Sequence, residues 1–270
     1  MSEMFAGKPA RHEHRLEAAG AVVTITLERP AAYNAVTRRL LRSLSATLDE
    51  VARDPAIRAV VVTGSGSGFC AGQALDDPDL MRDDVPTDIH AAIVEGFNPV
   101  IRALLTMEKP VVAAVNGVAA GAGFGIALAC DFRVVAQTAT FTTAFAKIGL
   151  VPDSGVSVLL PRMIGYARAM ESCMLSGKLD AAAAHSLGLV TELVPFSDVV
   201  PRAQAFAARL AAGPKALGLV KRELARNALG DISAALNREA EIQSLAGQTS
   251  DAREGIRAFR AKRAPVFTGH

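Results

Sequence analysis

The chain has 270 residues, of which 50% are hydrophobic, so it is long enough to bury one large core. The net charge is only +2 and tryptophan is absent, which argues against a nucleic-acid partner. The three cysteines form no CxxC pair, no apolar leader opens the chain and no apolar stretch is long enough to span a bilayer, so we expect a cytoplasmic protein with reduced thiols and no membrane association.

The first part of the chain alternates strand and helix patterns. Residues 21–27 (AVVTITL) and 59–63 (AVVVT) are rich in β-branched side chains and predict two buried strands. Residues 35–53 carry apolar side chains at helical spacing, and Thr37 is placed to cap that helix. Residues 64–72 contain four glycines, which predicts a loop after the second strand.

The middle of the chain continues this alternation. Residues 76–88 are polar and interrupted by proline, which predicts a mobile loop. Residues 89–107 predict an amphipathic helix that Gly96 and Pro99 interrupt, and residues 122–129 predict a second helix. Further strands are predicted at residues 111–115, 132–136 and 140–143.

From about residue 180 onwards the pattern is helical and rich in alanine. Strands that alternate with helices before this point predict an α/β fold built from β-β-α or β-α units. We expect two regions, an α/β core at residues 1–198 and a C-terminal helical region at residues 199–270 that packs on the core or on a neighbouring subunit. The predicted late helices are residues 181–186, 200–212, 214–228, 232–247 and 251–262.

Two glycine-rich loops, residues 64–73 and 116–123, each follow a predicted buried strand. Without side chains, their backbone N–H groups can approach a ligand closely, and the second loop opens a helix whose first N–H groups lack intrahelical partners. Two such groups aimed at one point would form an oxyanion hole. Tight turns and close helix–strand packing are the commoner reason for such glycines, and neither loop carries a nucleotide-binding signature.

Asp153 precedes a predicted helical run at residues 156–163. An aspartate at this place is typical of a helix N-cap. Alternatively, its carboxylate faces the same cleft as the two glycine-rich loops, where apolar neighbours would raise its pKa towards that of a useful general base. The residues by themselves leave both interpretations open.

The remaining polar residues give no sign of a metal centre. The five histidines show neither HxxxH nor HExxH spacing, so we expect no metal ion. His90 follows the loop that is predicted to be mobile, and we expect it to be solvated. The basic residues of the last predicted helix form mainly a solvated face, from which one or two side chains could meet a phosphate.

An ordered series of short stretches runs from about residue 14 to residue 268. It comprises RP (29–30), NA (34–35), GFCAG (68–72), KPVVAAVNG (109–117), GAG (121–123) and GLVP (149–152), followed by residues 181–190 and 251–263. Together these stretches resemble the crotonase (enoyl-CoA hydratase/isomerase) superfamily. Three segments resemble more closely its 1,2-epoxyphenylacetyl-CoA isomerases of phenylacetate catabolism: VNGVAAGAG (115–123), AFAKIGLVPD (144–153) and the end of the chain, from REG (253–255) to FTG (267–269).

The resemblance implies the ClpP/crotonase fold, a spiral of β-β-α units whose C-terminal helices complete a homotrimer or a hexamer built as a dimer of trimers. The substrate would be an acyl-CoA thioester, with no cofactor besides the coenzyme A that it carries. Position by position, the backbone N–H groups of Gln73 and Ala122 match the oxyanion hole. Ala71, Gly72 and Lys262 match positions that bind CoA, the last of them a basic residue that can meet the phosphates.

The resemblance also bears on the choice between water addition and isomerisation. Hydratases of the superfamily use two glutamates, and the matching positions here hold Gly125 and Phe145, neither of which can move a proton. These two residues would instead belong to the substrate pocket. The aspartate of the isomerases matches Asp153, which favours proton shuttling over water addition. Ala74 stands where the superfamily usually has aspartate, and we expect this to loosen the loop without removing the Gln73 N–H.

We therefore expect an acyl-CoA isomerase acting on an enoyl-CoA or a 1,2-epoxyphenylacetyl-CoA thioester. One alternative is an enoyl-CoA hydratase of fatty-acid oxidation. A second is an acyl-CoA dehalogenase or thioesterase in which the aspartate attacks covalently, although dehalogenases of the superfamily also use a tryptophan that this chain lacks. A third is a non-catalytic binding protein on the same scaffold; RNA binding, known in some relatives, is disfavoured by the near-neutral charge and scarce aromatic residues.

Overall fold

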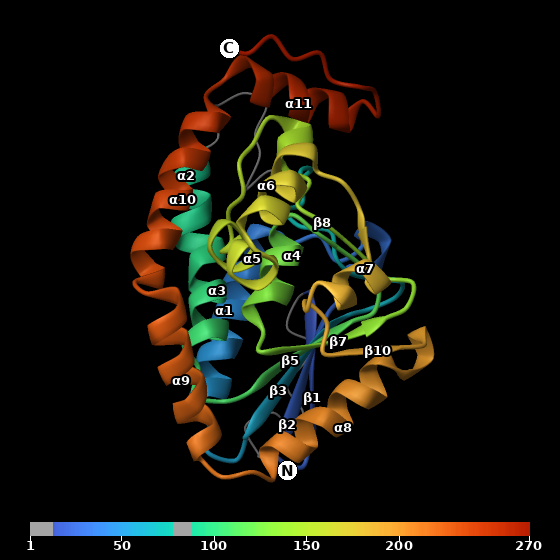
Figure 1. The fold of residues 1–270 in the computed structure, drawn as a ribbon, viewed down its shortest axis with the longest axis vertical. Coiled ribbons are helices and arrows are strands. Elements are labelled where there is room, and N and C mark those ends of the chain that lie inside the picture. Colours follow the sequence, from blue (N-terminus) through green and yellow to red (C-terminus); the bar gives the residue numbers. More distant parts are fainter. Residues whose placement is uncertain (1–12, 78–87) are drawn as a thin grey trace.

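The computed structural model describes residues 13–77 and 88–270 and contains two β-sheets (Figure 1). The larger sheet has the order β1-β2-β3-β5-β7-β10, in which β1 and β2 are antiparallel and all other neighbours are parallel. The smaller sheet has the order β4-β6-β8-β9, with β8 and β9 antiparallel. The strands are β1 (His14–Ala19), β2 (Val22–Leu27), β3 (Ala59–Gly64), β4 (Gly68–Cys70), β5 (Val111–Val115), β6 (Val118–Ala120), β7 (Phe132–Ala136), β8 (Thr140–Thr142), β9 (Leu179–Asp180) and β10 (Glu192–Val194).

Pairs of strands followed by helices form a repeating pattern. β3 lies in the larger sheet and β4 in the smaller, and the same division holds for β5 and β6 and for β7 and β8. Helices follow each pair, so the expected α/β spiral of β-β-α units is confirmed. The helices of these units are α2 (Ile89–Ala92), α3 (Asn98–Thr106), α4 (Ala122–Ala129), α5 (Val156–Ile164) and α6 (Tyr166–Leu175).

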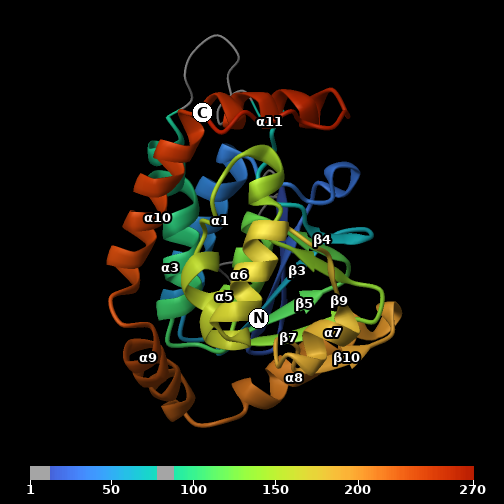
Figure 2. The same ribbon diagram turned by 45° about the horizontal axis from the view of Figure 1, so that its top comes forward.

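The C-terminal helices wrap around this core (Figures 1 and 2). α8 packs on β3 and β5, α9 and α10 pack along α3, and α11 crosses one end of the molecule onto the short 3₁₀ helix η3 (Phe145–Ile148). None of the helices in the described ranges combines the length and hydrophobicity that a bilayer span requires. The remaining helices are η1 (Pro30–Ala32), α1 (Arg38–Arg53), α7 (Ala181–Ser186), η4 (Phe196–Asp198), α8 (Val199–Ala211), α9 (Ala216–Leu229), α10 (Ile232–Gly247) and α11 (Ser250–Arg260).

Two helix features follow from local chemistry. Thr37 caps α1 as expected, because its hydroxyl oxygen accepts a hydrogen bond from the Leu40 N–H at 3.0 Å. The helix predicted at residues 89–107 is divided by a π-helical turn, η2 (Ile93–Phe97). Pro99 lacks an N–H and cannot close the regular ladder with the preceding turn, which accounts for the irregularity at this place.

Several short elements were not predicted from local pattern. β4 lies within the stretch predicted as a loop, residues 64–72, and β1, β6, β9, β10 and α6 were not predicted. β1 pairs with the adjacent β2, whereas the other strands are held by pairing with neighbours distant in sequence, such as β4 with β6 and β10 with β7. Most of the mobile loop predicted at residues 76–88, namely residues 78–87, lies outside the described part of the chain.

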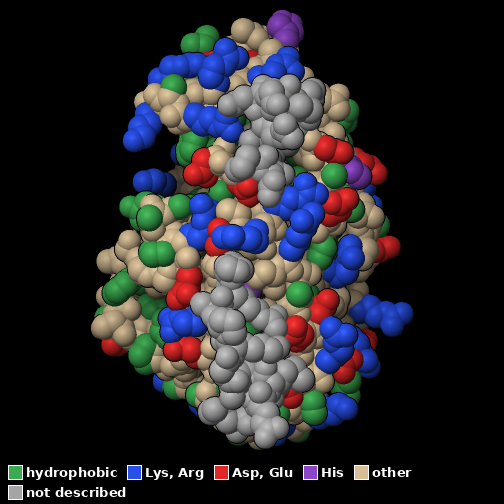
Figure 3. All heavy atoms as spheres, turned by 180° about the vertical axis from the view of Figure 1, so that it is seen from behind, with side chains coloured by type: hydrophobic (Ala, Val, Ile, Leu, Met, Phe, Trp, Pro, Cys, Tyr) green, Lys and Arg blue, Asp and Glu red, His purple; other side chains and the backbone are tan. Residues whose placement is uncertain are grey.

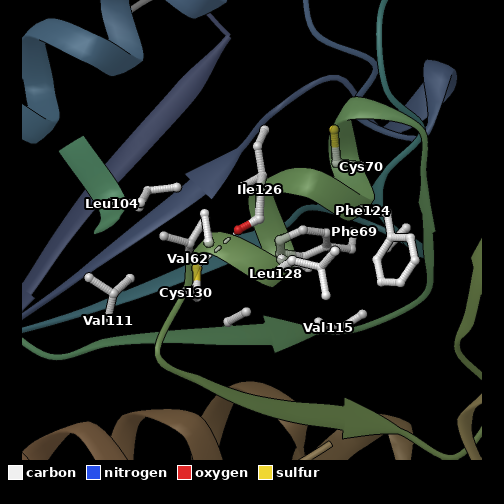
Figure 4. Close-up of a cluster of buried hydrophobic side chains, with 14 of the residues drawn as sticks. Val62, Phe69, Cys70, Leu104, Val111, Val115, Phe124, Ile126, Leu128 and Cys130 are labelled. Atoms are coloured by element: carbon white, nitrogen blue, oxygen red, sulfur yellow. Dashed lines mark hydrogen bonds between the residues drawn. The ribbon is translucent and has the colours of Figure 1, made fainter. Parts of the chain in front are cut away.

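Helix α4 lies in the middle of the core, and each of its residues is buried. Phe124 packs on Phe141 of β8 with ring centroids 5.2 Å apart. In the close-up, side chains of β3, α3 and β5 surround the helix, and the Cys130 thiol donates to the Ile126 carbonyl at 3.3 Å (Figure 4). Close packing on all sides fixes the place of the first helical residue, Ala122.

Candidate active site

A cavity of about 160 Å³ lies where the parallel strands of the smaller sheet end. β4, β6 and β8 run parallel, so their carboxyl ends meet at one edge, where α/β proteins commonly bind ligands. The loops that follow these strands form the walls together with α10 and α11. Among the residues predicted from the sequence, the cavity is lined by Ala71, Gly72, Gln73, Ala122, Phe145 and Asp153.

Two glycines allow the loop after β4 to touch the start of α4. A Cβ on Gly123 would lie 2.1 Å from the Cys70 carbonyl oxygen, and a Cβ on Gly72 would lie 2.8 Å from the Ala120 carbonyl oxygen and 3.4 Å from the Ala122 nitrogen. Gly72 also has a φ of +89°, a conformation that side chains disfavour. The glycines therefore do more than turn the chain: they bring the two loops into backbone contact.

Gln73 and Ala122, the two residues whose backbone N–H groups were predicted to form an oxyanion hole, both line the cavity. Val36 forms a parallel bridge with Gln73 that uses the Gly72 carbonyl and the Ala74 N–H, so the Gln73 N–H is left out of it. Ala122 is the first residue of α4, where an N–H has no intrahelical acceptor and carries partial positive charge. Two such donors can stabilise an oxygen that becomes negatively charged during a reaction.

Asp153 provides the carboxylate of the cavity. Its side chain is 5% exposed; Oδ1 accepts a hydrogen bond from Ser154 Oγ and Oδ2 accepts one from Gln243 Nε2, both at 2.8 Å. Burial raises the pKa of Asp153 to about 6, whereas the two hydrogen bonds act in the opposite direction. α5 begins at Val156 with Gly155 at the cap position and without a side-chain cap, so the alternative interpretation of Asp153 as an N-cap is wrong.

Gln243 is a residue of the cavity that sequence reasoning did not find. It comes from the second half of α10 and is 1% exposed. Its Oε1 accepts a hydrogen bond from the Val151 N–H at 2.8 Å, while its Nε2 donates to Asp153. No sequence signal pairs this glutamine with an aspartate 90 residues earlier, since only the fold brings the two together.

Glu239, one turn before Gln243 on α10, was also missed. Its carboxylate accepts hydrogen bonds from the Gly155 N–H at 2.8 Å, the Ser157 N–H at 3.1 Å and Ser157 Oγ at 2.5 Å. Burial raises the pKa of Glu239 to about 7, and the charge of Asp153 acts in the same direction. Glu239 thus satisfies the first N–H groups of α5, the task that the sequence had suggested for Asp153.

Gly125 and Lys262, both predicted as site residues, do not line the cavity. Gly125 is buried inside α4, and a Cβ there would lie 2.4 Å from the Ser154 carbonyl oxygen, so it is a point of close packing behind Asp153. Lys262 is exposed just after α11. His90 is exposed on α2 and also lies outside the cavity wall.

The open side of the cavity has a basic and an apolar side chain. Lys147 of η3 is exposed, and Phe259 of α11 is 61% exposed, yet both line the cavity. Seen from behind, Lys and Arg side chains gather over the end of the molecule at which α11 lies (Figure 3). Within residues 13–77 and 88–270, His, Cys, Asp and Glu form no group of three that could hold a metal ion.

Known proteins are similar to this chain along nearly its whole length. A family model described as enoyl-CoA hydratase/isomerase matches residues 17–270. The chain is 41% identical over 249 residues to 1,2-epoxyphenylacetyl-CoA isomerase of Escherichia coli, covering 92% of this chain and 95% of the relative. It is also 41% identical over 259 residues to a probable enoyl-CoA hydratase of Rhodobacter capsulatus, covering 96% and 98%. The crystal structure of an enoyl-CoA hydratase from Mycobacterium avium subsp. paratuberculosis matches with a TM-score of 0.86 at 34% identity, covering 96% of this chain and 100% of that one.

Proposed function

The chain belongs to the enoyl-CoA hydratase/isomerase family, and we propose that it is an acyl-CoA isomerase that uses one carboxylate as its acid and base. The substrate class is an enoyl-CoA or 1,2-epoxyphenylacetyl-CoA thioester. The second of these follows the name of the Escherichia coli relative. Besides the coenzyme A of the substrate, the proposed chemistry requires no cofactor.

The observation that carries this proposal is the single carboxylate at the cavity. Among the described residues that line it, Asp153 is the only aspartate or glutamate. The positions that match the two hydratase glutamates hold Gly125, which is packed against Ser154, and Phe145, which lines the wall. One group that can take up and return a proton suits a double-bond shift better than the addition of water.

The proposed mechanism needs two actions from these residues. The thioester oxygen accepts hydrogen bonds from the N–H groups of Gln73 and Ala122, which stabilises the negative charge that appears on it when a neighbouring carbon loses a proton. Asp153 removes that proton and returns it to another carbon, so that the product is an isomer of the substrate and the carboxylate is regenerated. For an epoxide substrate, the same carboxylate assists ring opening and rearrangement.

A panel of CoA thioesters tests the proposal: crotonyl-CoA, a 3-enoyl-CoA and epoxyphenylacetyl-CoA, each followed by spectrophotometry and product analysis. Asp153→Asn should lower kcat by on the order of 10²–10⁴-fold. The fold should persist, because an asparagine amide can still accept from Gln243 and donate to Ser154. Asp49→Asn, which changes an exposed carboxylate on α1, serves as the control. Full isomerase activity of Asp153→Asn would refute the assignment.

Hydration remains the second candidate because the Rhodobacter capsulatus relative is named a probable enoyl-CoA hydratase. In that case Asp153 would have to activate water without a second carboxylate on the described wall of the cavity. Rapid loss of crotonyl-CoA absorbance with formation of the 3-hydroxy product, and no shift of a 3-enoyl double bond, would favour hydration over isomerisation.

We also propose that the chain assembles as a homotrimer or as a dimer of trimers. The C-terminal helices expose large apolar side chains that a monomer would leave in water, among them Leu224 on α9, Leu245 on α10 and Phe259 on α11. Light scattering of the purified protein measures the assembly directly, and a monomer at micromolar concentration would contradict the proposal.

A further inference from the structure

Gln243 is buried although two of the apolar residues beside it on α10 are exposed. Ile242 is 51% exposed and Leu245 is 61% exposed, whereas Gln243 is 1% exposed. Burying an amide side chain is costly unless its polar atoms form hydrogen bonds. Both ends of this amide are bonded at 2.8 Å, the oxygen to the Val151 N–H and the nitrogen to Asp153 Oδ2.

The Val151 N–H determines which way the amide of Gln243 faces. A backbone N–H can only donate, so the group next to it must be the amide oxygen. If the amide were turned over, its NH₂ group would face the Val151 N–H and its oxygen would face the Asp153 carboxylate, which places donor against donor and acceptor against acceptor. The amide nitrogen therefore always points at Asp153, where it can only donate.

The two hydrogen bonds to Asp153 differ in whether the partner group can accept as well as donate. The hydroxyl of Ser154 can rotate and either donate or accept, so it can bond the carboxyl group in both protonation states. Gln243 cannot make this adjustment. Its bond to Oδ2 is strongest when the carboxylate is ionised, the form that a base must have before it accepts a proton.

Helix α10 holds the chain on both sides of this base. Gln243 binds Val151 and Asp153, and Glu239 binds Gly155 and Ser157. Residues four apart lie on the same face of a helix, so a single face of α10 binds four residues of one segment, at positions 151, 153, 155 and 157. We propose that Gln243 is a positioning residue, through which α10 orients Asp153 and favours its ionised form; this inference rests on the proposed role of Asp153 as the acid and base.

Two other charged groups lie near Asp153. Glu239, on the same helix, is an acid whose ionisation opposes that of Asp153. Lys147 lines the cavity from η3, is exposed and is therefore screened by solvent. Neither is altered when Gln243 is replaced, so a variant at residue 243 tests the amide itself.

Gln243→Glu is the most informative variant. Its carboxyl group keeps an acceptor for the Val151 N–H but places a second acidic oxygen against Asp153, and two adjoining carboxylates cannot both ionise easily. The low-pH limb of kcat/KM should therefore move upward by about one pH unit or more, with about fivefold or greater loss near pH 6, about tenfold or greater loss near pH 5, and recovery at high pH. Gln243→Met, which removes the donor without adding a charge, should move the limb in the same direction by less. Gln248→Glu, at an exposed position just after α10, adds the same charge and should leave the profile unchanged.

A titration that does not depend on turnover separates this inference from the proposed function. The ¹³C resonance of the Asp153 carboxyl group, assigned by its loss in Asp153→Asn, should titrate at higher pH in both Gln243 variants than in the wild type. If no CoA thioester is turned over but this shift is seen, the proposed reaction is wrong, whereas the effect of Gln243 on the ionisation of Asp153 stands. If turnover is normal while the pH profile and the resonance match the wild type in Gln243→Met, and in Gln243→Glu when it folds, the positioning role is refuted.

Discussion

Gly125→Ala tests whether the packing behind Asp153 controls its function. A Cβ at this position would lie 2.4 Å from the Ser154 carbonyl oxygen and 2.9 Å from the Ser154 Cβ. Ordinary contact begins near 3.4 Å, so the loop that carries Asp153 would have to move by about 1 Å away from α4. α4 itself has little freedom to yield, because all its residues are buried.

The expected effect on stability is smaller than the effect on catalysis. Overpacking a core costs about 1–3 kcal/mol, and replacing a helical glycine by alanine recovers about 1 kcal/mol. The free energy of unfolding should therefore fall by roughly 0–2 kcal/mol. A displacement of about 1 Å at a catalytic group can reduce the rate on the order of 10²-fold, which corresponds to about 2.7 kcal/mol, so the loss in kcat should exceed the loss in stability.

Urea unfolding followed by circular dichroism measures the free energy of unfolding. The effect on catalysis is measured as kcat on the best CoA thioester of the panel. Gly177→Ala is the control, because a Cβ at Gly177 has no neighbour within 4 Å. The control should match the wild type in both measurements. A Gly125→Ala protein with wild-type kcat and unaltered unfolding would refute the argument that this glycine sets the position of the base.

Two further predictions concern pH. The wild-type kcat/KM should fall about tenfold for each pH unit below about 6, because a base whose pKa is about 6 is protonated there; a profile that is flat from pH 5 to pH 8 would exclude Asp153 as the base. The free energy of unfolding should fall by up to about 4 kcal/mol between pH 5 and pH 8. In the folded protein Asp153 and Glu239 have pKa values of about 6 and about 7, whereas in the unfolded chain both lose their protons near pH 4. The folded state therefore loses stability as the pH rises through these two values. Urea titrations across this range measure it, and stability that rises with pH would contradict the buried state of these acids.

The elements that could be predicted are those with strong local periodicity. α4 and α10 begin and end where the pattern predicted, at residues 122–129 and 232–247. The buried strand predicted at residues 59–63 corresponds to β3, since a run of valines fits a pleated, fully covered surface. Of the smaller sheet, the pattern predicted only β8, at residues 140–143. β4, β6 and β9 could not be found in this way, because each has two or three residues and depends on pairing with distant partners.

The site could be predicted only in part, for a related reason. The glycine-rich loops and Asp153 each have a local signature, and the resemblance to a family placed them together. Local pattern alone also favoured a capping role for Asp153, because it could not show that Glu239 already bonds to the start of α5. Gln243 has no local signature at all, since it is one polar residue in a helix with many.

The contact between α10 and residues 151–157 joins two parts of the chain that are synthesised at different times. The strands and Asp153 leave the ribosome well before residues 232–247 do. Until these residues have been made, Asp153 lacks the hydrogen bond that Gln243 donates to it. A polypeptide that ends before residue 232 would therefore lack every contact through which α10 holds residues 151, 153, 155 and 157.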